Sequence, residues 1–240
     1  MIPNHYGRTE AGKPEDKTLE LMWSNLPDYT DGRNALVMAD TSGSMMHPGP
    51  NSPISVSVSL ALYFAERNKG AFENHFLTFS AQPELQSIVG SSLRDKMHNL
   101  KNADWDQNTN LQAAFDLVLN TAVANSTPDS ELPRTIYIIS DMEFDSATSY
   151  GYGQHSDTTN FEEIARKYEA AGYEMPQLVF WNVDARNTHS SVTKNQQGVT
   201  LVSGFSTTIF RQVMEAKTPR QLVDEVLASD RLKLVNGLTV

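Results

Sequence analysis

The stretch ALVMADTSGS, residues 35–44, decides the fold expected for this chain. Its first five residues form a short apolar run, which is typical of a strand covered on both faces. An acid and two hydroxyls, Asp40, Ser42 and Ser44, then follow at every second position past the end of that strand. Such a set of oxygen ligands, with little charge and room for water, suits hard divalent cations such as Mg²⁺. The stretch therefore predicts a buried strand followed by a candidate metal-binding loop.

Strands and helices are expected to alternate from residue 34 onward. The hydrophobic pattern predicts strands at 35–39, 75–79, 85–89, 135–139, 178–183 and 199–202, with the second and third paired as a hairpin. It predicts helices at 54–68, 91–101, 111–122, 161–171, 206–216 and 219–228, and a short one near 18–25. This order predicts an α/β fold with a doubly wound, mostly parallel sheet flanked by helices on both faces. We expect residues 1–33 to be a polar lead-in or linker, 34–230 the domain and 231–240 a tail.

Composition narrows the class of protein further. The chain has 240 residues, 29 acids against 19 bases, and a net charge of −10, which argues against binding a phosphate backbone through its own surface. It has no cysteine, which excludes disulfides, thiolate metal sites and cysteine nucleophiles and fits a reducing compartment. The N-terminus has no signal-peptide pattern and no apolar stretch is long enough for a membrane span. We therefore expect a cytoplasmic protein with no membrane contact.

Two more candidate ligands lie downstream of the first loop. Thr109 directly precedes the helix predicted from 111, and Asp141 follows the TIYIIS strand at 135–140. Ligands bind beyond the carboxyl ends of strands in such sheets, so Asp40 and Asp141 are predicted at one edge. Alone, Thr109 could equally be a helix N-cap and Asp141 a turn residue.

Several neighbours of these residues could assist the site or a partner. Asn108, Glu143 and Asp145 could lie just behind the ligands, although a solvated acidic loop is an equally good interpretation of the two acids. His47 could gate the site, but Mg²⁺ does not favour imidazole. Tyr150 and Tyr152 lie in a long loop at 142–159, where they could anchor a partner or pack the loop on the sheet.

In this order, the three segments resemble the metal-ion-dependent adhesion site (MIDAS) of von Willebrand factor A (vWA) domains: D-x-S-x-S, then a threonine before a helix, then an aspartate after a strand. The resemblance covers about residues 34–216 and implies a Rossmann-like vWA fold. It also implies that Ser42 and Ser44 bind the metal directly, and Thr109 directly or through water. Asp40 and Asp141 would act mainly through water, or one of them directly. The ion would be Mg²⁺, with Mn²⁺ acceptable, and an acidic residue of a partner protein would complete its coordination.

A closer resemblance is to a vWA family of unknown function that occurs in plants, bacteria and large viruses. The segments that carry it lie at 39–45, 76–93, 108–119, 139–145, 168–183 and 198–206. This family is similar in turn to the C-terminal half of Ro-type RNA-binding proteins, in which a helical-repeat ring precedes the vWA domain. No such ring is present in this sequence, so a role with RNA would be indirect, as a scaffold module acting with a missing upstream domain.

Two enzyme classes share part of the pattern. Asp40-Thr41-Ser42-Gly43 resembles the loop of aspartic proteases, but those need two such loops and an all-β setting. A Mg²⁺-dependent phosphotransferase or hydrolase could use Asp40 as nucleophile, although Ser42 stands where a second aspartate is expected. No Walker A or G-x-S-x-G motif occurs. The sequence favours a non-catalytic, metal-dependent protein-interaction domain.

Overall fold

The structure is a computed structural model, and the account below rests on the part of the chain that it describes. The described residues are 17–40, 45–46, 52–78, 80, 82–103, 111–141, 157–184, 192–194, 199–204, 206, 209–210 and 213. The chain divides into two units, Met1–Gly204 and Phe205–Val240. The first unit holds the sheet and its helices, and the second contributes only residues 206, 209–210 and 213 to the described part.

Seven strands in the described residues form one sheet, in the order β3-β2-β1-β4-β5-β7-β6. They are β1 (Ala35–Ala39), β2 (His75–Leu77), β3 (Leu85–Ser87), β4 (Thr135–Ser140), β5 (Gln177–Asn182), β6 (Val192–Lys194) and β7 (Val199–Ser203). The five inner strands run parallel, whereas β3 and β6 pair antiparallel at the two edges. The predicted doubly wound, mostly parallel sheet is therefore confirmed, as is the hairpin of β2 and β3.

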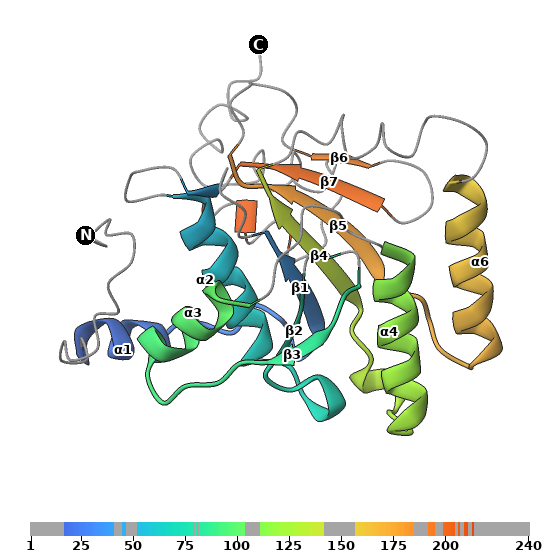
Figure 1. Ribbon diagram of the computed structural model, residues 1–240, viewed down its shortest axis with the longest axis horizontal. Helices are drawn as coiled ribbons and strands as arrows, with labels where there is room; N and C mark the ends of the chain where they lie inside the picture. The colour runs from blue at the N-terminus through green and yellow to red at the C-terminus, as the bar shows by residue number, and fades with distance from the viewer. Residues whose placement is uncertain are drawn as a thin grey trace, which may run out of the picture. The chain divides into compact units, whose positions relative to one another are not determined.

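Helices cover both faces of this sheet (Figure 1). They are α1 (Lys17–Ser24), α2 (Pro53–Ala65), α3 (Leu93–Lys101), α4 (Leu111–Ala124) and α6 (Asp157–Ala170), with short 3-10 turns η2 (Gly70–Phe72) and η3 (Asp129–Glu131). On one face Phe64 of α2 stacks on Tyr137 of β4, with ring centroids 4.8 Å apart. On the other, Phe115 of α4 and Tyr168 of α6 join a buried cluster with Ile136 and Ile138. Successive side chains of β4 thus pack into hydrophobic cores on opposite faces of the sheet, which explains why this strand is apolar throughout.

Local signals account for where the helices begin. Pro53 opens α2, where its missing N–H leaves no hydrogen bond unmade. Before α3, the Ser92 side chain accepts from the Asp95 backbone N–H, while the Asp95 carboxylate accepts from the Ser92 backbone N–H. This capping box satisfies two of the donors that a helix start leaves open.

The structure corrects two expectations about the later part of the chain. Helix α6 begins at Asp157, so the loop predicted at 142–159 ends three residues earlier. Its first turn, Asp-Thr-Thr-Asn, carries no apolar residue by which hydrophobic periodicity could have marked it. Strand β6 was not predicted, because three residues at a sheet edge are too few to show alternation. The helices predicted at 206–216 and 219–228 lie almost entirely outside the described residues.

The first described residues belong to the same unit as the sheet. Helix α1 is bonded to α2, because the Trp23 indole N–H donates to Glu66 Oε2 at 2.7 Å, and Lys96 of α3 donates to the other oxygen of Glu66. The Leu93 backbone N–H also donates to Glu20 of α1 at 2.7 Å. Residues 17–33, predicted as a lead-in, thus lie packed on α2 and α3 here. None of the helices in the described ranges is long and apolar enough to cross a bilayer.

Candidate metal centre at the carboxyl edge of the sheet

The order of the strands reverses direction at β1. The chain runs from β1 to β2 on one side of it and later places β4 on the other side. Between the carboxyl ends of β1 and β4 lies the switch point, which is the usual ligand site of an open α/β sheet. Asp40 directly follows β1 and Asp141 directly follows β4. The structure therefore brings both predicted acids to this edge, as the sequence indicated.

Asp40 is held through both its backbone and its side chain. The residue is 3% exposed, and its backbone N–H donates to the carbonyl of Ile139 at 2.8 Å. The Ser140 hydroxyl donates to Asp40 Oδ2 at 2.7 Å. From α2, the hydroxyl of Ser57 donates to the Asp40 carbonyl at 3.2 Å. The carboxylate thus has a defined orientation at the end of β1.

Ser140 was not among the residues predicted for the site. It is the last residue of β4 and is 2% exposed. The strands pair with Ala39 opposite Ile139, so Asp40 and Ser140 come next, side by side. Ser140 could have been recognised from the parallel register of β1 and β4. One of these buried strands is followed by an acid, and the other ends in a residue with a hydroxyl.

The chemistry of these side chains fits a hard divalent cation. Asp40, Ser140 and Asp141 offer only carboxylate and hydroxyl oxygens, which Mg²⁺ prefers to nitrogen or sulfur. Asp40 is buried whereas Asp141 is partly exposed, so the edge offers one enclosed carboxylate and one that solvent reaches. Within the described residues no group of three or more His, Cys, Asp and Glu side chains gathers as a metal site. The two acids would hold such an ion only together with further hydroxyls or water.

The other predicted site residues lie outside the described residues. These are the three hydroxyl ligands Ser42, Ser44 and Thr109, the assisting residues Asn108, Glu143 and Asp145, and the possible partner-binding residues His47, Tyr150 and Tyr152. Their assignments stay predictions.

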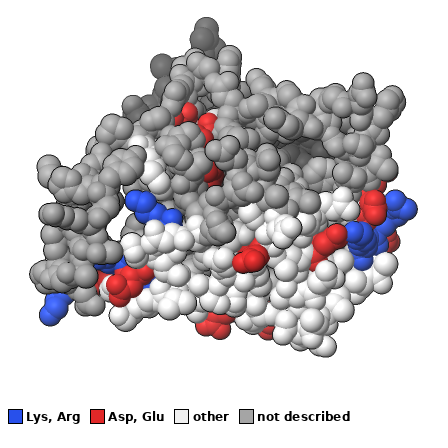
Figure 2. Space-filling model, in the orientation of Figure 1, with Lys and Arg blue, Asp and Glu red and all other residues white. Residues whose placement is uncertain are grey.

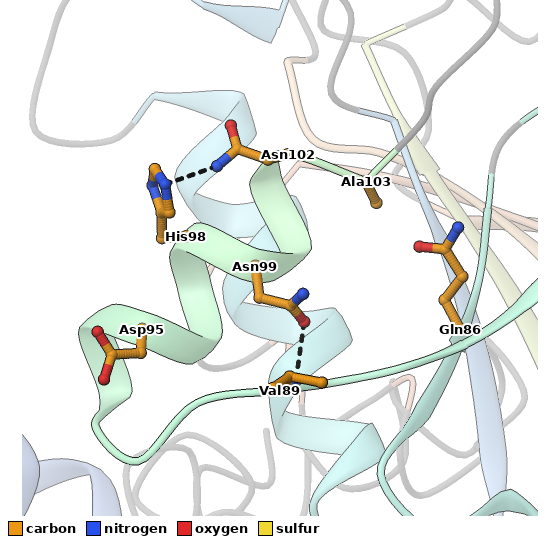
Figure 3. Close-up of a pocket in the computed structure, with 7 residues that line it drawn as sticks. All are labelled: Gln86, Val89, Asp95, His98, Asn99, Asn102 and Ala103. Atoms are coloured by element: carbon orange, nitrogen blue, oxygen red, sulfur yellow. Dashed lines mark hydrogen bonds between the residues drawn. The ribbon is translucent and has the colours of Figure 1, made fainter. Parts of the chain in front are cut away.

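A separate hollow lies between β3 and α3 (Figure 3). It is lined by Gln86, Val89, Asp95, His98, Asn99, Asn102 and Ala103. Several of its polar groups bond to one another: the Val89 backbone N–H donates to Asn99 Oδ1, and Asn102 Nδ2 donates to the His98 ring, both at 2.8 Å. Because these groups already have partners, the hollow makes a weak candidate for ligand binding.

Charges are mixed on the face of the molecule in Figure 2. Over its described residues, Lys and Arg do not gather into one patch but alternate with Asp and Glu (Figure 2). This part of the surface therefore lacks the basic stripe that phosphate-backbone binding requires.

Comparisons with known proteins place the chain in a family. The family described as "Domain of unknown function (DUF7788)" matches residues 34–233. The uncharacterized protein L728 of Acanthamoeba polyphaga mimivirus is 30% identical over 207 residues, which cover 84% of this chain and 35% of the viral protein.

A solved structure shares the architecture. The crystal structure of the Deinococcus radiodurans RO (RSR) protein matches with a TM-score of 0.51 and 17% identity, over 82% of this chain and 37% of that one. At this identity the likeness shows the fold alone, and it supports a Rossmann-like fold of the vWA type. The chain thus spans little more than a third of either protein.

Proposed function

This chain belongs to the family of unknown function DUF7788, and we propose that it is a divalent-cation-dependent protein-interaction domain. In this proposal Mg²⁺ lies at the carboxyl edge of the sheet, held by Asp40, Ser42, Ser44, Thr109 and Asp141. Mn²⁺ would be accepted by the same oxygen ligands. A carboxylate of a partner protein then completes the coordination of the ion.

One observation carries the proposal: the hydrogen bond from Ser140 to Asp40, beside Asp141, at the switch point of the sheet. The Ser140 hydroxyl and the backbone bond to Ile139 hold the Asp40 side chain, which is 3% exposed, in one orientation at this edge. A cation bound there would meet a carboxylate oxygen that is already positioned.

The ion would also explain how an acidic protein accepts an acidic partner. The chain carries a net charge of −10, and its own Asp40 and Asp141 would repel an incoming carboxylate. A divalent cation at that edge reverses the local sign. Binding of the partner should therefore depend on the metal, and we propose a binding role without catalysis.

Calorimetric titration of chelator-stripped protein with Mg²⁺ and Mn²⁺ tests the site. The wild type should bind about one ion per chain, and Asp40→Ala should bind none while keeping its circular dichroism spectrum. Asp129→Ala is the matched control, because it removes the same charge before the amino end of β4, at the opposite edge of the sheet. Equal metal affinity in Asp40→Ala and the wild type would refute the proposed site. Mg²⁺-dependent turnover of a phosphate ester that Asp40→Asn abolishes would instead indicate an enzyme.

A further inference from the structure

A serine and a histidine lie in contact at the edge of the sheet away from the candidate metal centre. His75 is the first residue of β2 and Ser87 the last of β3, and the two are register partners in the antiparallel hairpin. Because β2 runs parallel to β1, its first residue lies at the amino edge of the sheet, opposite the carboxyl edge that holds Asp40 and Asp141. The Ser87 hydroxyl oxygen is 2.9 Å from His75 Nε2. A nucleophilic side chain thus touches a base far from the residues considered so far.

The other ring nitrogen of His75 sets the direction of this hydrogen bond. His75 Nδ1 lies 2.6 Å from the backbone carbonyl oxygen of Glu73. A carbonyl oxygen can only accept, so Nδ1 carries the proton and Nε2 of the neutral ring keeps its lone pair. The Ser87 hydroxyl therefore donates to Nε2. A serine bonded to a histidine that a third group orients is the arrangement that activates a serine for nucleophilic attack.

The register of the hairpin explains the contact and supplies a further donor. The Ile88 backbone N–H donates to the Asn74 carbonyl at 2.8 Å, so these two residues form a hydrogen-bonded pair of the ladder. Such pairs alternate with non-hydrogen-bonded ones, in which the side chains lie closer, and His75 and Ser87 are the next pair along. The Ser87 backbone N–H therefore points away from β2, toward the open side of β3, which is an edge strand of the described sheet. The backbone N–H of the nucleophile itself is one of the donors that stabilise the oxyanion in acyl transfer.

We propose that Ser87 is an acyl-accepting nucleophile with His75 as its general base, and that it reacts with small carboxylic esters. Ser87 is exposed and His75 partly exposed, so a small ester reaches the pair directly. This activity uses no metal and is separate from the carboxyl edge of the sheet, whose proposed role stays one of binding.

The reaction follows from the two ring nitrogens of His75. Ser87 Oγ attacks the carbonyl carbon of the ester while its proton passes to His75 Nε2, and the Glu73 carbonyl holds the resulting imidazolium through Nδ1–H. The Nε2 proton then goes to the leaving alkoxide as the ester C–O bond breaks, which yields acyl-Ser87 and the free alcohol. Water attacks the acyl group through the same base, releases the carboxylic acid and restores the serine.

The test uses the full chain, a chelator and p-nitrophenyl acetate as the ester. Ser87→Ala removes the nucleophile, and His75→Gln removes the base while keeping an amide N–H that can donate to the Glu73 carbonyl. Ser91→Ala and His98→Gln are the matched controls: Ser91 is an exposed serine whose hydroxyl meets a carboxylate, and His98 an exposed histidine bonded to an asparagine. Release of p-nitrophenolate measures the rate, mass spectrometry of peptides locates the acetyl group, and circular dichroism shows that each variant is folded.

The wild type should become acetylated on Ser87 and react about 100-fold or more faster than Ser87→Ala and His75→Gln, the factor typical of a general base. Ser91→Ala and His98→Gln should react as the wild type does. Equal rates in the wild type and Ser87→Ala, or acetylation confined to other residues, would overturn the inference. Undiminished acetylation of Ser87 in His75→Gln would also overturn it, because the histidine would then not be the base. Since the chelator is present throughout, these outcomes are independent of whether the carboxyl edge binds Mg²⁺.

Discussion

Replacing Ser140 by alanine should lower the free energy of unfolding by about 2 kcal/mol. The Ser140 hydroxyl donates at 2.7 Å to Oδ2 of Asp40, which is 3% exposed. A hydrogen bond to a charged group contributes about 1.5–3 kcal/mol, and its loss leaves a buried acceptor without that donor. The substitution removes an oxygen but no methylene, so it adds little cavity cost. For a domain of this size the melting temperature should fall by roughly 4–8 °C.

Urea unfolding followed by circular dichroism, with a chelator present, measures this change without any contribution from metal. Ser57→Ala is the matched control, because that hydroxyl is equally buried but donates to the neutral Asp40 carbonyl at 3.2 Å, and its loss should cost only about 1 kcal/mol. In an Asp40→Ala background the effect of Ser140→Ala should shrink to less than about 0.5 kcal/mol, because its acceptor is gone. If Ser140→Ala costs as much in that background as in the wild type, the hydrogen bond is not what the serine contributes.

Three further predictions concern the packing of the helices on the sheet. Burial raises the pKa of Tyr137 and of Tyr168 above the usual value of about 10, so stability should hold below about pH 10 and fall above it, where the unfolded chain ionises. Tyrosinate absorbance from these two rings should then appear only as the protein unfolds, and their ionisation before unfolding would contradict this. Phe64→Ala should cost about 3–5 kcal/mol in urea unfolding, since the ring is 2% exposed and stacks on Tyr137; a loss below about 1 kcal/mol would refute the packing. Glu66→Ala should speed hydrogen exchange in α1 by removing the acceptor of Trp23, yet change global stability by less than about 1 kcal/mol, because the Lys96 ion pair is partly exposed. Unchanged exchange in α1 would show that this contact does not hold the helix.

Much of the fold could be predicted from the sequence, because the patterns that mark its strands and helices are local. The run ALVMA before Asp40 and the run TIYIIS before Asp141 are apolar enough to mark buried strands, and the intervening periodicity of 3.6 marks helices. Strands that alternate with helices pair in parallel, and that rule alone places both acids at the carboxyl edge. Where the pattern was too short or too polar, as in β6 and the first turn of α6, the sequence carried no usable signal.

By itself, then, the sequence determined the order of the described helices and of every described strand except β6, the parallel sheet and the two acids at its carboxyl edge. Only the tertiary structure decided that Ser140 bonds to Asp40, since the two residues lie 100 positions apart and meet through the register of β1 and β4. The same is true of Ser87, which meets His75 only through the register of β2 and β3, because a slip by one residue would turn the serine to the other face of the sheet.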